Sequence, residues 1–86
     1  MPYMYILYSS EIERFYIGAT SSSPDERLVK HLTNHSGFTA RAKDWKVVYY
    51  EKCPSIQMAK ARERELKDWK SKYRIQKLID GSEHPA

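Results

Sequence analysis

Two short stretches rich in aromatic and β-branched residues lie close together near the start of the chain, and they constrain its fold more than any other feature. Residues 3–8 have the sequence YMYILY, and residues 14–20 have the sequence RFYIGAT. Stretches of this composition, separated by a short polar segment, predict two antiparallel strands joined as a β-hairpin. Because the first stretch is apolar at successive rather than alternating positions, it predicts a central strand with both faces buried.

The register of this hairpin decides how two of its tyrosines lie. With residues 9–12 as a four-residue loop, Tyr8 pairs with Glu13, and Tyr5 then lies directly opposite Tyr16. A shift by one residue would place the two phenols on opposite faces of the sheet. The tyrosines are either core packing or a pair of phenols at a site, and both interpretations stay open at this point.

The segment SSSPDERLVKHLTNHSG carries the signals of a helix with defined ends. Its N-cap, first helical position and capping-box position hold suitable residues, namely Ser23, Pro24 and Glu26. Leu28 and Leu32, with Val29 beside them, are predicted to form the buried stripe. Asn34 and Gly37 predict the end of this helix.

A third strand and further helical sequence follow. Residues 45–51, WKVVYYE, predict the strand, and Ser55 after Pro54 predicts the N-cap of a long helix. The pattern leaves open whether this helix continues through residues 71–79 or breaks near Ser71.

The predicted order of elements is β-β-α-β-α-α. This order indicates an α+β fold with a small, mainly antiparallel three-stranded sheet flanked by helices. With 86 residues, the chain has room for one domain and a modest core. We expect this domain to cover residues 1–80, and we expect residues 81–86 to form a disordered tail.

Basic residues are in excess, and they are concentrated in one part of the chain. Fifteen lysines and arginines stand against 11 acidic residues, and eight of the fifteen lie between residues 60 and 77, interleaved with Trp69 and Tyr73. Such a stretch is expected of a protein that binds a phosphate backbone. A solvated helix with ion pairs between residues four apart has the same pattern, so both interpretations stay open.

The composition also bears on the compartment. Cys53 is the only cysteine, which excludes an intrachain disulfide framework and a thiolate metal cluster. No apolar run approaches the roughly 20 residues that span a bilayer, and no positively charged leader precedes the first predicted strand. We therefore expect a cytoplasmic protein that does not interact with membranes.

Three residues outside the tyrosine pair have the chemistry of a phosphate-binding site, and one glycine accompanies them. Arg27 and His31 lie one helical turn apart, where a guanidinium could bind phosphate beside an imidazole that exchanges protons. The polar flank of an amphipathic helix would have the same pattern. Glu63 lies at the inner edge of an apolar helix face, either ion-paired with Arg27 or a lysine, or as a ligand for a hard divalent cation. Gly18 marks either a bulge or the close approach of a ligand.

Taken in order, these motifs resemble those of the GIY-YIG nuclease superfamily, in particular its small stand-alone members. YMYIL corresponds to the first name motif, with Tyr3 in place of its glycine, and YIG at residues 16–18 matches the second. RLVKH and ARERELKDWK follow in the expected order, and the similarity extends from about residue 3 to residue 79. Many relatives carry a polar residue about a dozen positions after the glutamate, near Ile75 of this chain.

The resemblance implies a nuclease site with five catalytic residues, Tyr5, Tyr16, Arg27, His31 and Glu63. It implies one Mg²⁺ or Mn²⁺ ion held by Glu63, and a strand that ends close to the substrate at Gly18. An ordinary tyrosine has a pKa of about 10. A phenol that takes a proton from water would therefore need Arg27, His31 and the metal to lower its pKa.

The resemblance also implies the reaction, which is metal-dependent hydrolysis of a nucleic-acid phosphodiester, with DNA favoured over RNA and a 5′ phosphate on the product. One active site cuts one strand, so cutting both strands of a duplex would need a homodimer, a partner protein or two successive binding events. The expected process is DNA repair or recombination. Six basic residues are expected to contact nucleic acid: Arg41, Lys43, Lys67, Lys70, Lys72 and Arg74. The alternative is a non-catalytic nucleic-acid-binding module on the same scaffold.

Overall fold

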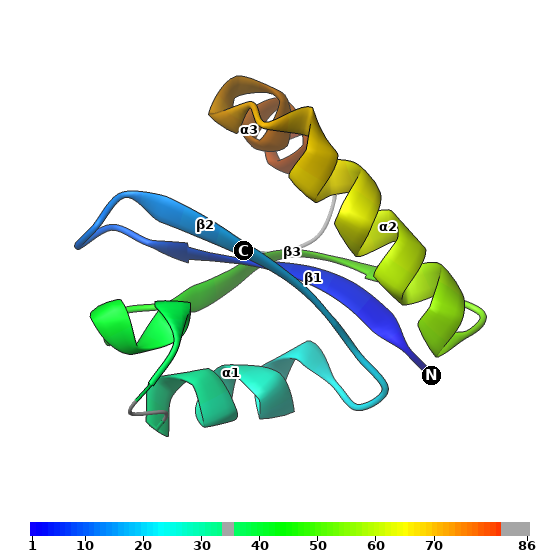
Figure 1. The fold of residues 1–86 in the computed structure, drawn as a ribbon, viewed down its shortest axis with the longest axis horizontal. Coiled ribbons are helices and arrows are strands. Elements are labelled where there is room, and N and C mark those ends of the chain that lie inside the picture. The colour runs from blue at the N-terminus through cyan, green and yellow to red at the C-terminus, as the bar shows by residue number, and fades with distance from the viewer. Residues whose placement is uncertain (34–35, 82–86) are drawn as a thin grey trace.

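The computed structural model describes residues 1–33 and 36–81, and these contain one three-stranded sheet and three α-helices in the predicted order (Figure 1). The strands are β1 (Tyr3–Ser9), β2 (Arg14–Thr20) and β3 (Lys46–Lys52). The helices are α1 (Pro24–Thr33), α2 (Ile56–Trp69) and α3 (Lys72–Asp80), and a short 3₁₀ helix, η1 (Phe38–Arg41), follows α1. The predicted α+β class is confirmed. Asn34, and residues 82–86 of the expected tail, lie outside the described residues.

β1 is the central strand, with β2 and β3 paired antiparallel on either side of it. Figure 1 shows helices on both faces of the sheet. α2 and α3 cover one face, where they pack on a core that includes Met4 and Ile6. α1 and η1 cover the other face, where the core includes Tyr5 and Leu7. Both faces of β1 are therefore buried, as its continuous apolar pattern predicted.

The hairpin forms, but its register differs from the predicted one by two residues. The loop covers residues 10–13 and begins one residue later than predicted, so Tyr5 lies opposite Gly18, and Tyr16 lies opposite Leu7. Because side chains alternate between faces with a period of two, this change leaves Tyr5 and Tyr16 on the same face. The centroids of their rings are 6.4 Å apart.

Hydrogen bonds at the turn stabilise this register. Ser9 Oγ accepts a hydrogen bond from Ile12 N at 3.3 Å and donates one to Asp44 Oδ1. Glu11 N donates to Asp44 Oδ2 at 2.8 Å. Glu13 closes the turn in the left-handed conformation, with φ of 51°. Ser9 and Asp44 are 35 residues apart, so the turn is supported by a tertiary contact that the local sequence pattern does not contain.

α1 has the predicted N-cap but a different buried face. Glu26 N donates to Ser23 Oγ at 3.1 Å. The prediction for Val29 is wrong, because its side chain is 60 % exposed, whereas His31 is only 5 % exposed. At 100° per residue, His31 lies on the same side of the helix as Leu28, and Val29 is rotated away from it.

α2 and α3 are separate helices, which resolves the point that the sequence pattern left open. Lys70 ends α2 in the left-handed conformation, with φ of 49°. Ser71 Oγ then caps α3 by accepting a hydrogen bond from Arg74 N at 3.2 Å. Within the described part of the chain, no helix has the length and apolar character needed to cross a membrane.

Gly18 leaves space for the ring of Tyr5. A Cβ atom at position 18 would lie 2.5 Å from both Cζ and Oη of Tyr5 and 2.9 Å from Cε1. The pairing of β1 with β2 is regular at this position, so Gly18 is not a bulge. A glycine is required here because the Tyr5 ring approaches the backbone closely. The resemblance had implied a close approach of the substrate at this position instead.

We expect Gly18→Ala to destabilise the fold by about 1–3 kcal/mol, the usual cost of overpacking, because the added methyl group overlaps the Tyr5 ring. Denaturant unfolding measures this change. Since Tyr5→Leu opens space above position 18, the double variant should lose less stability than the two single variants added together. Strictly additive losses would contradict the contact.

Candidate active site

Tyr5, His31 and Thr39 form a buried hydrogen-bonded chain on the α1 face of the sheet. Tyr5 Oη lies 2.9 Å from His31 Nε2, and His31 Nδ1 lies 3.0 Å from Thr39 Oγ1. The three residues are 1 %, 5 % and 3 % exposed, respectively. Trp45 Nε1 donates to the backbone oxygen of Thr39 at 2.9 Å and so helps to fix η1. Both ring nitrogens of His31 are therefore hydrogen-bonded within the protein.

Burial keeps both rings of this chain neutral near pH 7. It raises the pKa of the Tyr5 phenol above its ordinary value, and the hydrogen bond and charge of Arg27 only partly oppose this rise. Burial also lowers the pKa of His31, and the positive charge of Arg27 lowers it further. The neutral pair is satisfied when Tyr5 donates to Nε2 and the Nδ1–H group donates to Thr39. The protein groups around Tyr5 therefore raise its pKa rather than lower it.

Tyr16 is the phenol of the pair that reaches open space. It is partly exposed, and it lines a cavity of about 500 Å³ together with Arg27, His31 and Phe38. Its ring meets the His31 ring edge-on, with centroids 4.8 Å apart, and stacks on Phe38 with centroids 6.4 Å apart. Tyr16 can therefore contact a molecule in this cavity, whereas Tyr5 lies beneath its surface.

Arg27 contributes a hydrogen-bond donor that has no acceptor. Its Nε is buried and lacks a partner among the described residues, while its side chain lines the same cavity as Tyr16. A buried donor without an acceptor is costly, and a ligand oxygen would remove that cost. Because the guanidinium is also charged, the suitable ligand is an anionic oxygen such as that of a phosphate.

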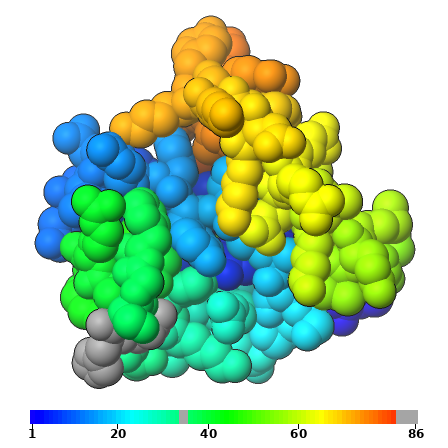
Figure 2. All heavy atoms as spheres, viewed as in Figure 1, coloured from blue at the N-terminus to red at the C-terminus, as the bar shows by residue number. Residues whose placement is uncertain are grey.

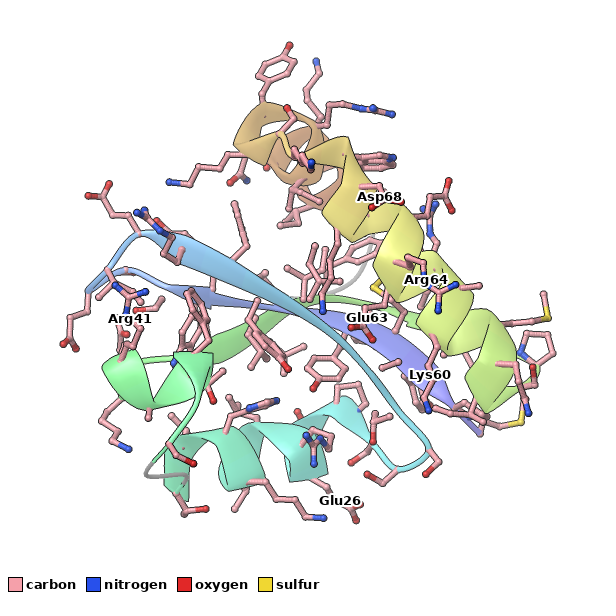
Figure 3. The ribbon with its side chains drawn as sticks, in the orientation of Figure 1. Glu26, Arg41, Lys60, Glu63, Arg64 and Asp68 are labelled. Carbon is pink, nitrogen blue, oxygen red and sulfur yellow. The ribbon has the colours of Figure 1, made fainter. Side chains whose placement is uncertain are left out.

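Glu63 approaches the site from the opposite helical layer. α2 packs on β2, which is an edge strand, and Figure 3 shows Glu63 directed from α2 toward the side chains between α2 and α1. Its negative charge helps to raise the pKa of Tyr5. Glu63 Oε2 lies 2.6 Å from Lys67 Nζ, which is itself 5.9 Å from the centroid of the Tyr16 ring. Lys67 thus connects Glu63 with Tyr16. Glu63 itself lines a cavity with Lys60, Arg64 and Lys67.

The five residues expected to be catalytic are gathered in one region, although they come from four elements. Tyr5 and Tyr16 come from β1 and β2, Arg27 and His31 from α1, and Glu63 from α2. Figure 2 shows that the molecule is hollowed here, between the yellow atoms of α2 and the teal atoms of α1, with β2 beneath. A ligand can therefore reach the region from solvent.

Glu63 is the carboxylate in this region that could bind a metal ion. In residues 1–33 and 36–81, no group of three or more His, Cys, Asp or Glu side chains could hold a metal. Mg²⁺ nevertheless keeps several waters and is often bound by one or two carboxylates together with substrate phosphates. The Glu63 side chain is 23 % exposed, so it fits such an ion, which would replace Lys67 as its counter-charge.

Three of the six residues expected to contact nucleic acid line a second cavity. Lys67, Lys70 and Lys72 surround it together with Arg14, and its volume is about 660 Å³. Arg62, in the same basic stretch of sequence, is instead held by ion pairs of 3.0 Å to each of two glutamates. The basic stretch therefore divides into residues at a cavity and residues that stabilise the fold.

The other three expected contacts lie elsewhere. Arg41 belongs to η1, where Figure 3 labels it, and its guanidinium lies 5.4 Å from the centroid of the Phe38 ring. Lys43 Nζ donates to a backbone oxygen of α1 at 3.3 Å. The guanidinium of Arg74 lies 4.2 Å from the centroid of the Trp69 ring. Each of these side chains therefore has a contact within the fold.

Thr39, Trp45 and Arg14 belong to these sites without any sequence motif that identifies them. Thr39 lies eight residues after His31, and the surrounding segment FTAR matches no motif that would indicate a site. Trp45 resembles the first residue of a strand, but it lies in the core just before β3. The roles of Thr39 and Trp45 depend on how η1 packs against α1 and β1, and that of Arg14 depends on how β2 lies against α2 and α3.

The lowered pKa of His31 predicts that the protein loses stability in mild acid. In the unfolded chain a histidine binds its proton at a pKa of about 6.5, whereas folded His31 binds it only at lower pH. The unfolded state then holds more protons, so the free energy of unfolding decreases as the pH falls below about 6.5. We expect a lower thermal midpoint at pH 5.5 than at pH 7.5.

The control for this prediction is His31→Gln, which keeps polar contacts but does not titrate. Its thermal midpoint should change less between the two pH values than that of the wild type. Asp44 has a pKa lowered mainly by its hydrogen bond from Ser9, so it stays ionised in this range. An equal pH dependence in both proteins would contradict a buried neutral His31.

The comparison with known families agrees with this arrangement. A family model described as the GIY-YIG catalytic domain matches residues 1–77. No curated protein and no solved structure matches the chain significantly. The matched range contains all five residues gathered at the site and nearly all of the 86 residues. This chain therefore belongs to the GIY-YIG family.

Proposed function

We propose that this protein is a metal-dependent endonuclease that hydrolyses phosphodiester bonds of nucleic acid, with DNA preferred to RNA. One active site cuts one strand, and the expected setting is DNA repair or recombination in the cytoplasm. The family match supports the nuclease class. The observation that carries the proposal is a cavity lined by the partly exposed Tyr16 and by Arg27, whose buried Nε has no acceptor among the described residues.

Each residue around the cavity has a role that follows from its surroundings. Arg27 binds a non-bridging oxygen of the phosphate and stabilises the negative charge that grows in the transition state. Tyr16, in its ionised phenolate form, takes a proton from the attacking water and becomes the neutral phenol, and the edge-on His31 ring holds the Tyr16 ring in place. Tyr5 is a positioning residue, because it is buried and acts through His31.

The bond changes define the product. A bond forms between the water oxygen and phosphorus, while the bond from phosphorus to the 3′ oxygen breaks, leaving a 5′ phosphate and a 3′ hydroxyl. Glu63 would hold one Mg²⁺ or Mn²⁺ ion together with waters and the substrate phosphate. When bound, such an ion supplies Lewis-acid stabilisation of charge on the phosphate and the leaving oxygen.

The test is nicking of a supercoiled plasmid in Mg²⁺, Mn²⁺ or EDTA. We expect nicked circles with either cation and none in EDTA, and ligase should reseal the nicks because their ends carry a 5′ phosphate. The appearance of linear plasmid at higher protein concentration would indicate that two copies, or two visits, cut opposite strands. Binding without cutting of any DNA or RNA substrate would favour the non-catalytic module.

A further inference from the structure

A second cavity adjoins the candidate active site at the outer edge of β2. Its volume is about 660 Å³, and it shares Tyr16 and Phe38 with the first cavity. Phe15, Leu66 and Ile75 also line it, so much of its wall is apolar. A ligand in the first cavity could therefore extend past Tyr16 into the second.

The rim of this second cavity is positively charged. Arg14, Lys70 and Lys72 are exposed, and none of them forms an ion pair with a carboxylate in the described part of the chain. Apolar walls bordered by uncompensated cations suit a ligand with a flat apolar body and negative charges attached to it.

The floor of this cavity adds a third property. β2 has a strand neighbour only on the β1 side within the described residues, and an edge strand leaves backbone N–H and C=O groups unpaired on its outer side. Phe38 is 38 % exposed and stacks on Tyr16, so an aromatic surface stands beside these groups. A nucleobase has both a face for stacking and an edge of donors and acceptors, and it matches this combination.

We propose that the second cavity binds an unpaired nucleobase next to the scissile phosphate, and that Arg14, Lys70 and Lys72 bind the phosphates that flank this base. The proposal rests on the proposed nuclease function and narrows its substrate to nucleic acid with an unpaired nucleotide close to the cut. A paired base is stacked within the duplex and cannot enter a protein pocket without leaving it.

Binding in EDTA tests this site without any cleavage. Three duplexes of equal length and flanking sequence serve as probes: one fully paired, one with a single bulged nucleotide, and one with an abasic residue in the bulge. We expect the bulge that carries a base to bind about tenfold more tightly than the abasic bulge, because stacking of the base on an aromatic side chain is lost in the latter. Fluorescence anisotropy at fixed ionic strength measures the three affinities.

Variants locate the effect within the cavity. Phe38→Ala should reduce the preference for the base to less than about twofold, since it removes the stacking surface. Lys70→Gln/Lys72→Gln should weaken the binding of all three duplexes and reduce the salt dependence by about two phosphate contacts. Lys46→Gln/Lys52→Gln makes the same charge change on β3, at the opposite edge of the sheet, and should leave binding close to that of the wild type. Thermal melting checks that each variant is folded.

The outcomes separate this proposal from the nuclease proposal. Equal affinity of the wild type for the base-containing and abasic bulges would overturn the base site, whatever the plasmid assay shows. A folded Phe38→Ala variant that keeps the tenfold preference would overturn it as well. A base preference that is present in EDTA, without nicking in Mg²⁺ or Mn²⁺, would uphold the base site and contradict the nuclease.

Discussion

Glu63→Gln should slow cleavage in Mg²⁺ by about a thousandfold or more and leave the fold and the affinity for nucleic acid in EDTA intact. The change keeps the shape of the side chain and removes the charge that would hold the cation. A catalytic metal contributes several kcal/mol to transition-state stabilisation, and each 1.36 kcal/mol is a factor of ten in rate. The ion pair with Lys67 joins residues four apart on one helix, and such pairs are worth only about 0.3–0.5 kcal/mol. Nicking rate, affinity and thermal melting should be measured on the same preparation.

Asp68→Asn is the matched control for this experiment. The substitution makes the same change of charge at an exposed position of α2, closer to the C-terminal end of the helix than Glu63 (Figure 3). The Asp68→Asn variant should cut at the wild-type rate. A Glu63→Gln protein that is folded and fully active would end the assignment of Glu63 as the metal ligand. One that melts early but keeps its activity per folded molecule would make Glu63 a structural partner of Lys67.

Arg27→Lys should slow cleavage by about 10²–10³-fold, which is the typical cost of removing one donor aimed at transition-state charge. Lysine keeps the positive charge, but its compact ammonium cannot reproduce the planar fork of the guanidinium. Nε of Arg27 has no partner among the described residues, so the loss of this atom breaks no hydrogen bond, although the side chain of Arg27 also forms one with Tyr5. Single-turnover cleavage in Mg²⁺ should therefore fall much more than affinity in EDTA.

Arg64→Lys is the corresponding control, since Arg64 is exposed on α2. It should cut at nearly the wild-type rate. If Arg27→Lys reduced affinity and cleavage by the same factor, Arg27 would contribute to substrate binding only, without any preference for the transition state. If the affinity and the cleavage rate of Arg27→Lys both stayed at the wild-type level, the reaction would not take place in the cavity beside Tyr16.

The elements and much of their arrangement follow from local patterns in the amino-acid sequence. The apolar run of β1 requires burial on both faces, and β1 is the central strand. Ser23 and Ser55 each occupy the predicted helix N-cap position and accept the hydrogen bond that such a residue accepts. These signals were readable because they act within one turn of helix or along one strand.

Tyr5 and Tyr16 lie on the same face of the sheet, as predicted, although the register behind that prediction was wrong. The predicted register was wrong by two residues, yet both phenols still lie on the α1 side of the sheet. The alternation of side chains has a period of two, so this error moved neither tyrosine to the other face. The turn that sets the true register is supported by Asp44, far along the chain, and local patterns carry no information about such a partner.

Folding determines which side chains meet and which protonation states they adopt. On α2, Lys67 forms an ion pair with Glu63 and also lies over the ring of Tyr16. η1 encloses His31, so that burial lowers its pKa and raises that of Tyr5 in spite of the nearby Arg27. Desolvation and charge pairing depend on groups that folding brings together from distant parts of the chain, whereas caps and strand periodicity depend on neighbours in sequence.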